Sequence, residues 1–99
     1  MQYLKALWHR AGKHDPIVLI SELDDERYEV RKVEVFADGL LGFAGKQASA
    51  GGTRLGAEPV PGNSEILAEA EFSLEPIGRE EFEKIWSAAL SGARWPIES

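Results

Sequence analysis

The stretch Ser21–Gly39, which reads SELDDERYEVRKVEVFADG, decides the fold of this chain. It predicts the end of one strand, a tight acidic turn at Asp24–Glu26, a long strand over Arg27–Ala37 and a second turn at Asp38-Gly39. β-branched and aromatic residues favour the strand, while Asp and Gly favour the turns. Because a turn stands at each end, we expect the long strand to pair with the segments on both sides of it.

The hydrophobic pattern changes phase inside this strand. Tyr28 and Val30 share one face, whereas Val33 and Val35 lie on the other. Since side chains alternate along a strand, either both faces of the sheet are buried or a β-bulge near Arg31-Lys32 re-aims the residues that follow.

The neighbouring segments complete an antiparallel meander over residues 1–47. Tyr3–His9 alternates and predicts an outer or half-buried strand, whereas the apolar run in Ile17–Leu23 predicts a central one. Leu40–Ala44 follows the Asp-Gly pair, a strong hairpin signal, and should return antiparallel. Residues 1–47 therefore predict four strands.

The second half of the chain predicts a long loop and two helices. Lys46–Ser64 is rich in Gly and Pro, so we expect it to be mobile, or docked mainly through Leu55 and Val60. Ser64 is a candidate cap for a short helix over Glu65–Glu71, and Phe72–Ile77 is a possible fifth strand.

The clearest helix is Arg79–Leu90, because Phe82, Ile85, Trp86 and Ala89 form one apolar stripe. That stripe requires a sheet face to cover. The chain therefore predicts one α+β domain over residues 1–99, an antiparallel sheet packed against a C-terminal helix.

Composition narrows the functional class. The 99 residues carry a formal net charge of −6, which repels phosphate backbones, disfavours nucleic-acid binding and suits a basic protein partner. The same acids could simply keep a small domain soluble. The chain has no cysteine, and its longest apolar run, Ile17–Ile20, is far too short for a membrane helix. We expect a cytoplasmic protein that does not bind membranes.

Charged residues supply the candidate binding sites. The acidic turn is either a solvated turn or a surface for a basic partner. The charges that alternate along the long strand form either cross-strand ion pairs or a platform for a partner. In a second reading, the chain is a small enzyme or ligand-binding domain in which an arginine of the Gly51–Gly56 loop grips an anion. The selected binding residues are Glu22, Asp24, Asp25, Glu26, Arg31, Lys32 and Arg54.

A metal site is disfavoured. His9, His14 and Asp15 provide suitable ligand atoms, but they span a strand end and a loop, and no fourth ligand is fixed nearby. We select no catalytic residue, no metal ligand and no cofactor.

Several of these segments together resemble a family of small uncharacterised bacterial domains. The shared motifs are YLKxxW at Tyr3–Trp8, then SELD, RKVE, DG, GGTRLG and EEFEKIW, and together they span Tyr3–Trp86. The resemblance implies the domain limits but supplies no activity. By size, acidity and single-domain form the chain is similar to immunity proteins that neutralise bacterial toxins. We therefore expect a noncatalytic binding module. A structural module in a larger assembly is a third possibility.

Overall fold

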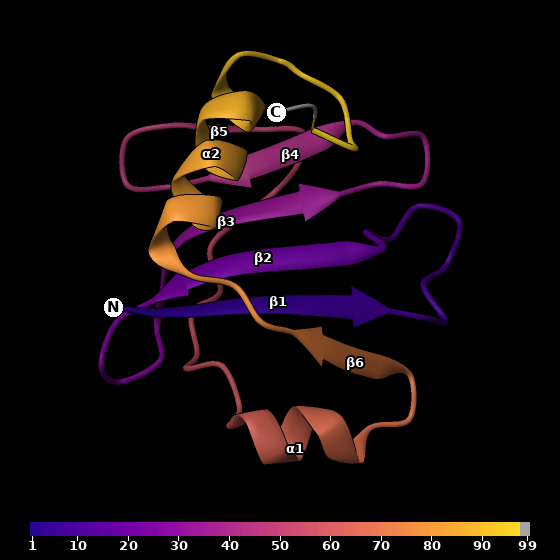
Figure 1. Ribbon diagram of the computed structural model, residues 1–99, viewed down its shortest axis with the longest axis vertical. Helices are drawn as coiled ribbons and strands as arrows, with labels where there is room; N and C mark the ends of the chain where they lie inside the picture. The colour runs from indigo at the N-terminus through magenta and orange to yellow at the C-terminus, as the bar shows by residue number, and fades with distance from the viewer. Residues whose placement is uncertain (98–99) are drawn as a thin grey trace.

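Strands from both halves of the chain form one antiparallel sheet in the computed structural model, which describes residues 1–97. The sheet order is β5-β4-β3-β2-β1-β6 (Figure 1). The predicted α+β class, with a C-terminal helix packed against an antiparallel sheet, is confirmed. The strands are β1 (Gln2–Trp8), β2 (Val18–Leu23), β3 (Glu29–Val35), β4 (Leu41–Ala44), β5 (Ser49–Ala50) and β6 (Phe72–Glu75).

The sequence predicted that β1 is an outer or a half-buried strand, and the structure agrees with this in part. It is half-buried as predicted, but it is not an outer strand, because β6 pairs with it and takes the edge. Lys5 lies opposite Glu75, and Trp8 lies opposite Phe72. This pairing joins segments that are far apart in the sequence, so no local sequence pattern predicts it.

Helix α2 (Arg79–Leu90) covers one face of the sheet, which we call the helix face (Figure 1). Its bounds agree with the prediction. Phe82, Ile85 and Ala89 are buried, and they pack with apolar residues of β2 and β3 in one core cluster. Trp86 is only half-buried, on the flank of that cluster.

The change of phase in β3 comes from a bulge. Glu22 lies opposite Arg31 but Leu23 lies opposite Glu29, which leaves Val30 without a partner on β2. The bulge thus falls just before the expected Arg31-Lys32 position. Because of it, Arg31 lies on the helix face.

The loop 51–62 crosses the opposite face of the sheet, and we call it the strap and that face the strap face (Figure 1). Thr53 is 2% exposed, and its hydroxyl donates a 2.7 Å hydrogen bond to Glu34 Oε1. A Cβ on Gly42 would lie 2.1 Å from Thr53 Oγ1, so glycine allows this close approach. Leu55 and Val60, the two residues expected to dock the loop, are both half-buried, and the Val60 N–H donates a hydrogen bond to the Arg27 carbonyl. Thr53 is a further, more deeply buried anchor that the sequence did not indicate.

The strap leads into α1 (Asn63–Ala68), which differs from the expected Glu65–Glu71. Gly62, not Ser64, is its N-cap, because the Gly62 carbonyl accepts the first helical hydrogen bonds from Glu65 and Ile66. None of the α1 residues is buried.

Within residues 1–97, no helix is long and apolar enough to cross a membrane.

Candidate functional site

Two of the predicted binding residues form an ion pair on the helix face. Arg31 Nε and Nη2 donate hydrogen bonds of 2.6 and 2.9 Å to the two carboxylate oxygens of Glu22. Tyr3 donates a 3.0 Å hydrogen bond to the same carboxylate, and Glu83 of α2 also binds Arg31. The Glu22 side chain is 7% exposed. Glu22 and Arg31 therefore lie at the margin of the core, where their charges compensate each other.

The rings of α2 complete the environment of Arg31. Its guanidinium carbon lies 4.9 Å from the centroid of the Phe82 ring and 5.2 Å from that of Trp86, both within cation–π range. The hydrogen bonds from Arg31 lower the pKa of Glu22, and those same bonds raise the pKa of Arg31. Burial, followed by the hydrogen bond to Glu22, raises the pKa of Tyr3. Each shift favours the protonation state that the group already has at neutral pH.

Lys32 lies on the other face of β3. Its Nζ is 3.1 Å from Glu29 Oε1, an oxygen that also accepts a hydrogen bond from the backbone N–H of Gly56. Lys32 and Glu29 therefore help to hold the strap.

Arg54 is exposed on the strap, between residues whose hydrogen bonds go to the sheet. Thr53 donates to Glu34 and Gly56 donates to Glu29. These two donors of the Gly51–Gly56 loop are thus occupied by carboxylates of the chain itself. The anion site proposed for this loop stays a prediction.

The carboxylates of the acidic turn have different roles. Asp24 Oδ1 accepts 2.9 Å hydrogen bonds from the backbone N–H groups of Glu26 and Tyr28, so Asp24 shapes the turn. Asp25 and Glu26 are exposed. These two acids are available to a partner without any change to the turn.

Arg27, which is not among the predicted binding residues, organises this end of the molecule. Its Nε donates to the Val60 carbonyl at 3.0 Å, and its Nη2 donates to the Pro61 carbonyl at 2.7 Å and to Asn63 Oδ1 at 3.0 Å. The Val60 N–H in turn donates to the Arg27 carbonyl at 2.8 Å. The Arg27 backbone has φ of 69°, a left-handed value that costs a residue with a side chain about 1–3 kcal/mol. We call these hydrogen bonds of Arg27 the Arg27 clamp. No pattern of residues in the sequence predicts it.

The clamp places the acidic turn beside the first residue of α1. Figure 1 shows both at the same end of the molecule, with the β2–β3 turn at the lower left and α1 at the bottom. We call the exposed acids of this region the acidic margin, which comprises Asp25, Glu26, Glu65 and Glu69.

A groove of about 390 Å³ lies on the strap face, between α1 and the sheet. Its floor is apolar and comes from β1, β2 and β6, while the end of the strap and α1 form its walls. The lining residues are Leu4, Ala6, Leu19, Ser21, Glu29, Val60, Pro61, Glu65, Ile66, Glu69 and Phe72. The lining therefore carries three carboxylates and no basic side chain.

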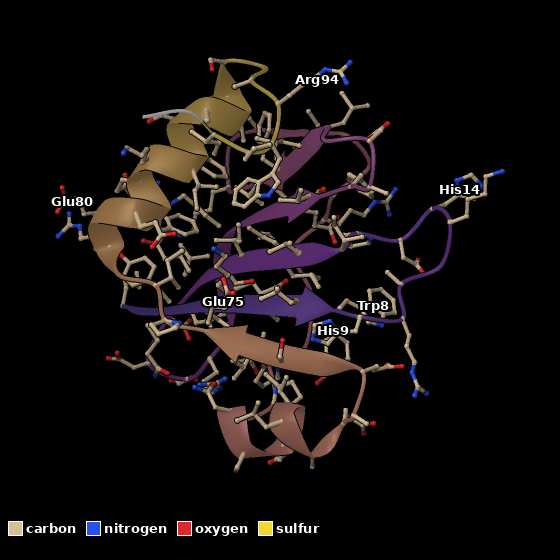
Figure 2. The ribbon with its side chains drawn as sticks, turned by 45° about the vertical axis from the view of Figure 1, so that its right-hand side comes forward. Trp8, His9, His14, Glu75, Glu80 and Arg94 are labelled. Atoms are coloured by element: carbon tan, nitrogen blue, oxygen red, sulfur yellow. The ribbon has the colours of Figure 1, made fainter. Side chains whose placement is uncertain are left out.

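The two histidines lie apart from these features. His9 directly follows β1 and lies beside β6, where its Nε2 is 2.7 Å from Ser73 Oγ, whereas His14 points away from the sheet on the following loop (Figure 2). Across the described part of the chain, no three His, Cys, Asp or Glu side chains are grouped as metal ligands would be.

The chain matches a known family over most of its length. The family model described as "Domain of unknown function (DUF6881)" matches residues 2–91. No curated protein and no solved structure matches the chain.

Proposed function

Since this chain belongs to the DUF6881 family, which is defined by a domain of unknown function, we propose a function from its own residues. The chain is a noncatalytic module that binds a basic protein through the acidic margin. The partner is a toxin, and the chain is a bacterial immunity protein that neutralises it.

The observation that supports this proposal is the arrangement of acids around the Arg27 clamp. Arg27 bonds to carbonyl and amide oxygens, so its hydrogen bonds do not consume the carboxylates beside it. Asp25 and Glu26 remain exposed on one side of the clamp, and Glu65 and Glu69 on the other. The four carboxylates outnumber the single Arg27 guanidinium among them, so this surface carries a net negative charge, which attracts a basic protein during its approach and raises the rate of association.

The ionisable groups whose pKa values are shifted lie outside the acidic margin, and their hydrogen bonds stabilise the fold. Glu22, Arg31 and Tyr3 are bound to one another on the helix face. A partner can therefore contact the acidic margin without disturbing that cluster.

The test is a biosensor measurement of association between this chain and a basic protein encoded by the neighbouring gene. We expect the association rate to fall about tenfold from low to high salt, as charge steering requires. Asp25→Asn with Glu26→Gln should slow association at low salt. Glu80→Lys is the matched control, because both changes move the net charge from −6 to −4 and Glu80 is an exposed residue of α2 that projects outward from that helix (Figure 2).

Equal rates for the two variants, or a rate that does not depend on salt, would refute the acidic margin as the interface. The toxin assignment has its own readout, which is growth of cells that express the neighbouring gene with and without this chain. If the chain does not restore growth, the immunity function is wrong.

A further inference from the structure

We propose that the groove under α1 is the specificity pocket of the acidic margin, and that it binds a large apolar side chain flanked by lysine or arginine on the basic partner. This inference rests on the proposed function and names the feature that the partner presents.

The groove has the size and the chemistry of a side-chain pocket. Its volume of about 390 Å³ falls in the range of roughly 300–1,000 Å³ that is usual for ligand sites. Leu4, Ala6, Leu19 and Phe72 form an apolar floor. An apolar side chain that enters would be removed from water, with a gain of roughly 25 cal/mol for each Å² that is buried.

One polar group is built into this floor. Ser21 is 3% exposed and lines the groove, and its hydroxyl can donate or accept a hydrogen bond. A bound backbone segment carries both donors and acceptors, so it can use this group, whereas a purely apolar ligand cannot.

The charge of the groove selects the neighbours of that side chain. Glu29 is bound to Lys32 and to Gly56, so the carboxylates available at the rim are Glu65 and Glu69. Both residues line the groove, Glu65 from the first turn of α1 and Glu69 from its C-cap. A partner cation at this rim would be attracted by both carboxylates.

The end of α1 also favours a cation. The C-cap of α1 is Glu69, and its last turn has no basic residue, although a positive charge is favourable at this end of a helix. A lysine or arginine of the partner would supply the missing charge. The rim carboxylates and the C-terminal end of α1 therefore indicate the same sign of ligand.

The two walls of the groove differ in how firmly they are held. Arg27 fixes Val60 and Pro61 through three hydrogen bonds, so the strap wall is preformed. The α1 wall packs lightly, because none of its residues is buried and Gly62 provides no side-chain cap. This wall can therefore adjust to side chains of different size.

The experiment is an NMR titration of the intact chain with three matched peptides, acetylated and amidated at their ends. Lys-Leu-Leu-Lys carries both features, Lys-Ser-Ser-Lys carries the charge alone, and Glu-Leu-Leu-Glu carries the apolar pair alone. We expect only the first to saturate, with shifts concentrated at Leu4, Leu19, Ile66 and Phe72. Equal binding of the other two peptides, or shifts spread over all acidic surfaces, would overturn the proposal.

Two variants locate the site. Glu65→Gln with Glu69→Gln should weaken Lys-Leu-Leu-Lys about three- to tenfold, while Glu80→Lys, which changes net charge by the same amount, should alter it less than twofold. Ile66→Lys places a cation in the groove and should abolish binding, with backbone shifts outside α1 unchanged if the fold is intact. Equal effects of the first two variants would refute the groove.

The failure of this inference is distinguishable from failure of the proposed function. If the neighbouring protein binds with salt-dependent rates but Ile66→Lys leaves its affinity unchanged, the groove is wrong and the acidic margin stands. If Lys-Leu-Leu-Lys saturates the groove but the neighbouring protein does not bind, the assigned partner is wrong and the groove stands.

Discussion

Glu22 shows how a charged residue becomes part of a small core. Its carboxylate accepts hydrogen bonds from Arg31 and Tyr3, and the Arg31 guanidinium lies over the rings of Phe82 and Trp86. The ion pair therefore connects β2, β3 and α2, and removal of one partner would leave the other charge poorly compensated.

We predict that Glu22→Gln lowers the free energy of unfolding by about 3 kcal/mol, because it leaves Arg31 with Glu83 alone. Glu22→Leu combined with Arg31→Met should be less destabilising than the single change, since it removes both charges together. Urea unfolding at neutral pH measures both values. A single variant as stable as the unaltered chain would show that the pair contributes little.

The same cluster predicts how stability depends on pH. Arg31 lowers the pKa of Glu22 from the ordinary 4.5, so the folded state binds fewer protons than the unfolded state in that region. The contribution of Glu22 is therefore complete above about pH 4.5 and is lost as the pH falls through the lowered value. Tyr3 has a raised pKa, so its contribution is present below pH 10.0 and is lost as the pH rises further.

Urea unfolding between pH 2 and pH 7 measures the acid limb. Glu22→Gln should flatten this part of the profile, and Asp25→Asn, which changes an exposed acid, is the control. If the unaltered chain and Glu22→Gln have parallel profiles, the shift of Glu22 does not contribute to stability.

At the scale of elements, the sequence predicted the helices and turns whose formation depends on residues close together in the chain. The stripe of α2 and the Asp-Gly turn identified their elements, because each depends on spacing within a few residues. The pairing of β6 with β1 could not be predicted in this way. This pairing depends on the path of the strap, which places β6 beside β1.

The two aromatic anchors of α2 should differ in their effects. Phe82 has no exposed surface, so Phe82→Ala should cost about 3–5 kcal/mol. Trp86 is half-buried, so Trp86→Ala should cost less than Phe82→Ala, although the sequence placed both rings on the same apolar stripe. Thermal unfolding with a matched denaturant series compares the two. A larger loss for Trp86→Ala would show that its contacts with Phe43 and Arg31 outweigh burial.

At the scale of the whole molecule, the strap joins the two edges of the sheet. It leaves β5, crosses behind β3 and ends at α1 beside β6 (Figure 1). Its polar anchors, Thr53 and Gly56, bind carboxylates of β3, and Arg27 holds its far end. The sequence predicted a loop that is either functional or mobile, but not its path, because these bonds join residues that are distant in the chain.

We predict that Arg27 couples the strap and α1 to the meander. Arg27→Gly removes the guanidinium while keeping the left-handed backbone favourable, so it isolates the clamp from backbone strain. Amide hydrogen exchange at Glu65, Ile66 and Glu69 should accelerate about tenfold or more, since hydrogen bonds to a charged group are strong. Amides of α2 should not change.

Arg54→Gly, which changes an exposed arginine of the same strap, is the control and should leave α1 exchange unaltered. Uniform acceleration over the whole sheet would indicate global destabilisation instead of local release.

The charge of the candidate site could be predicted from the sequence, but its shape could not. Composition indicated a basic partner, and the acidic turn was recognised in the sequence. The groove was not predictable, since its floor comes from β1, β2 and β6 and its walls come from the strap and α1. The role of Arg27 could not be predicted, because the sequence does not show that the φ of this turn residue is positive.

The late arrival of β6 has a consequence for synthesis on the ribosome. The meander is complete by Ala44, but the outer side of β1 lacks its neighbour until residues 72–75 have emerged. During that interval β1 is an open edge, with Leu4 and Ala6 exposed on the strap face, and such an edge pairs readily with another chain. A nascent chain that stalls between β4 and β6 should therefore aggregate more readily than the finished protein, in which β6 covers this edge.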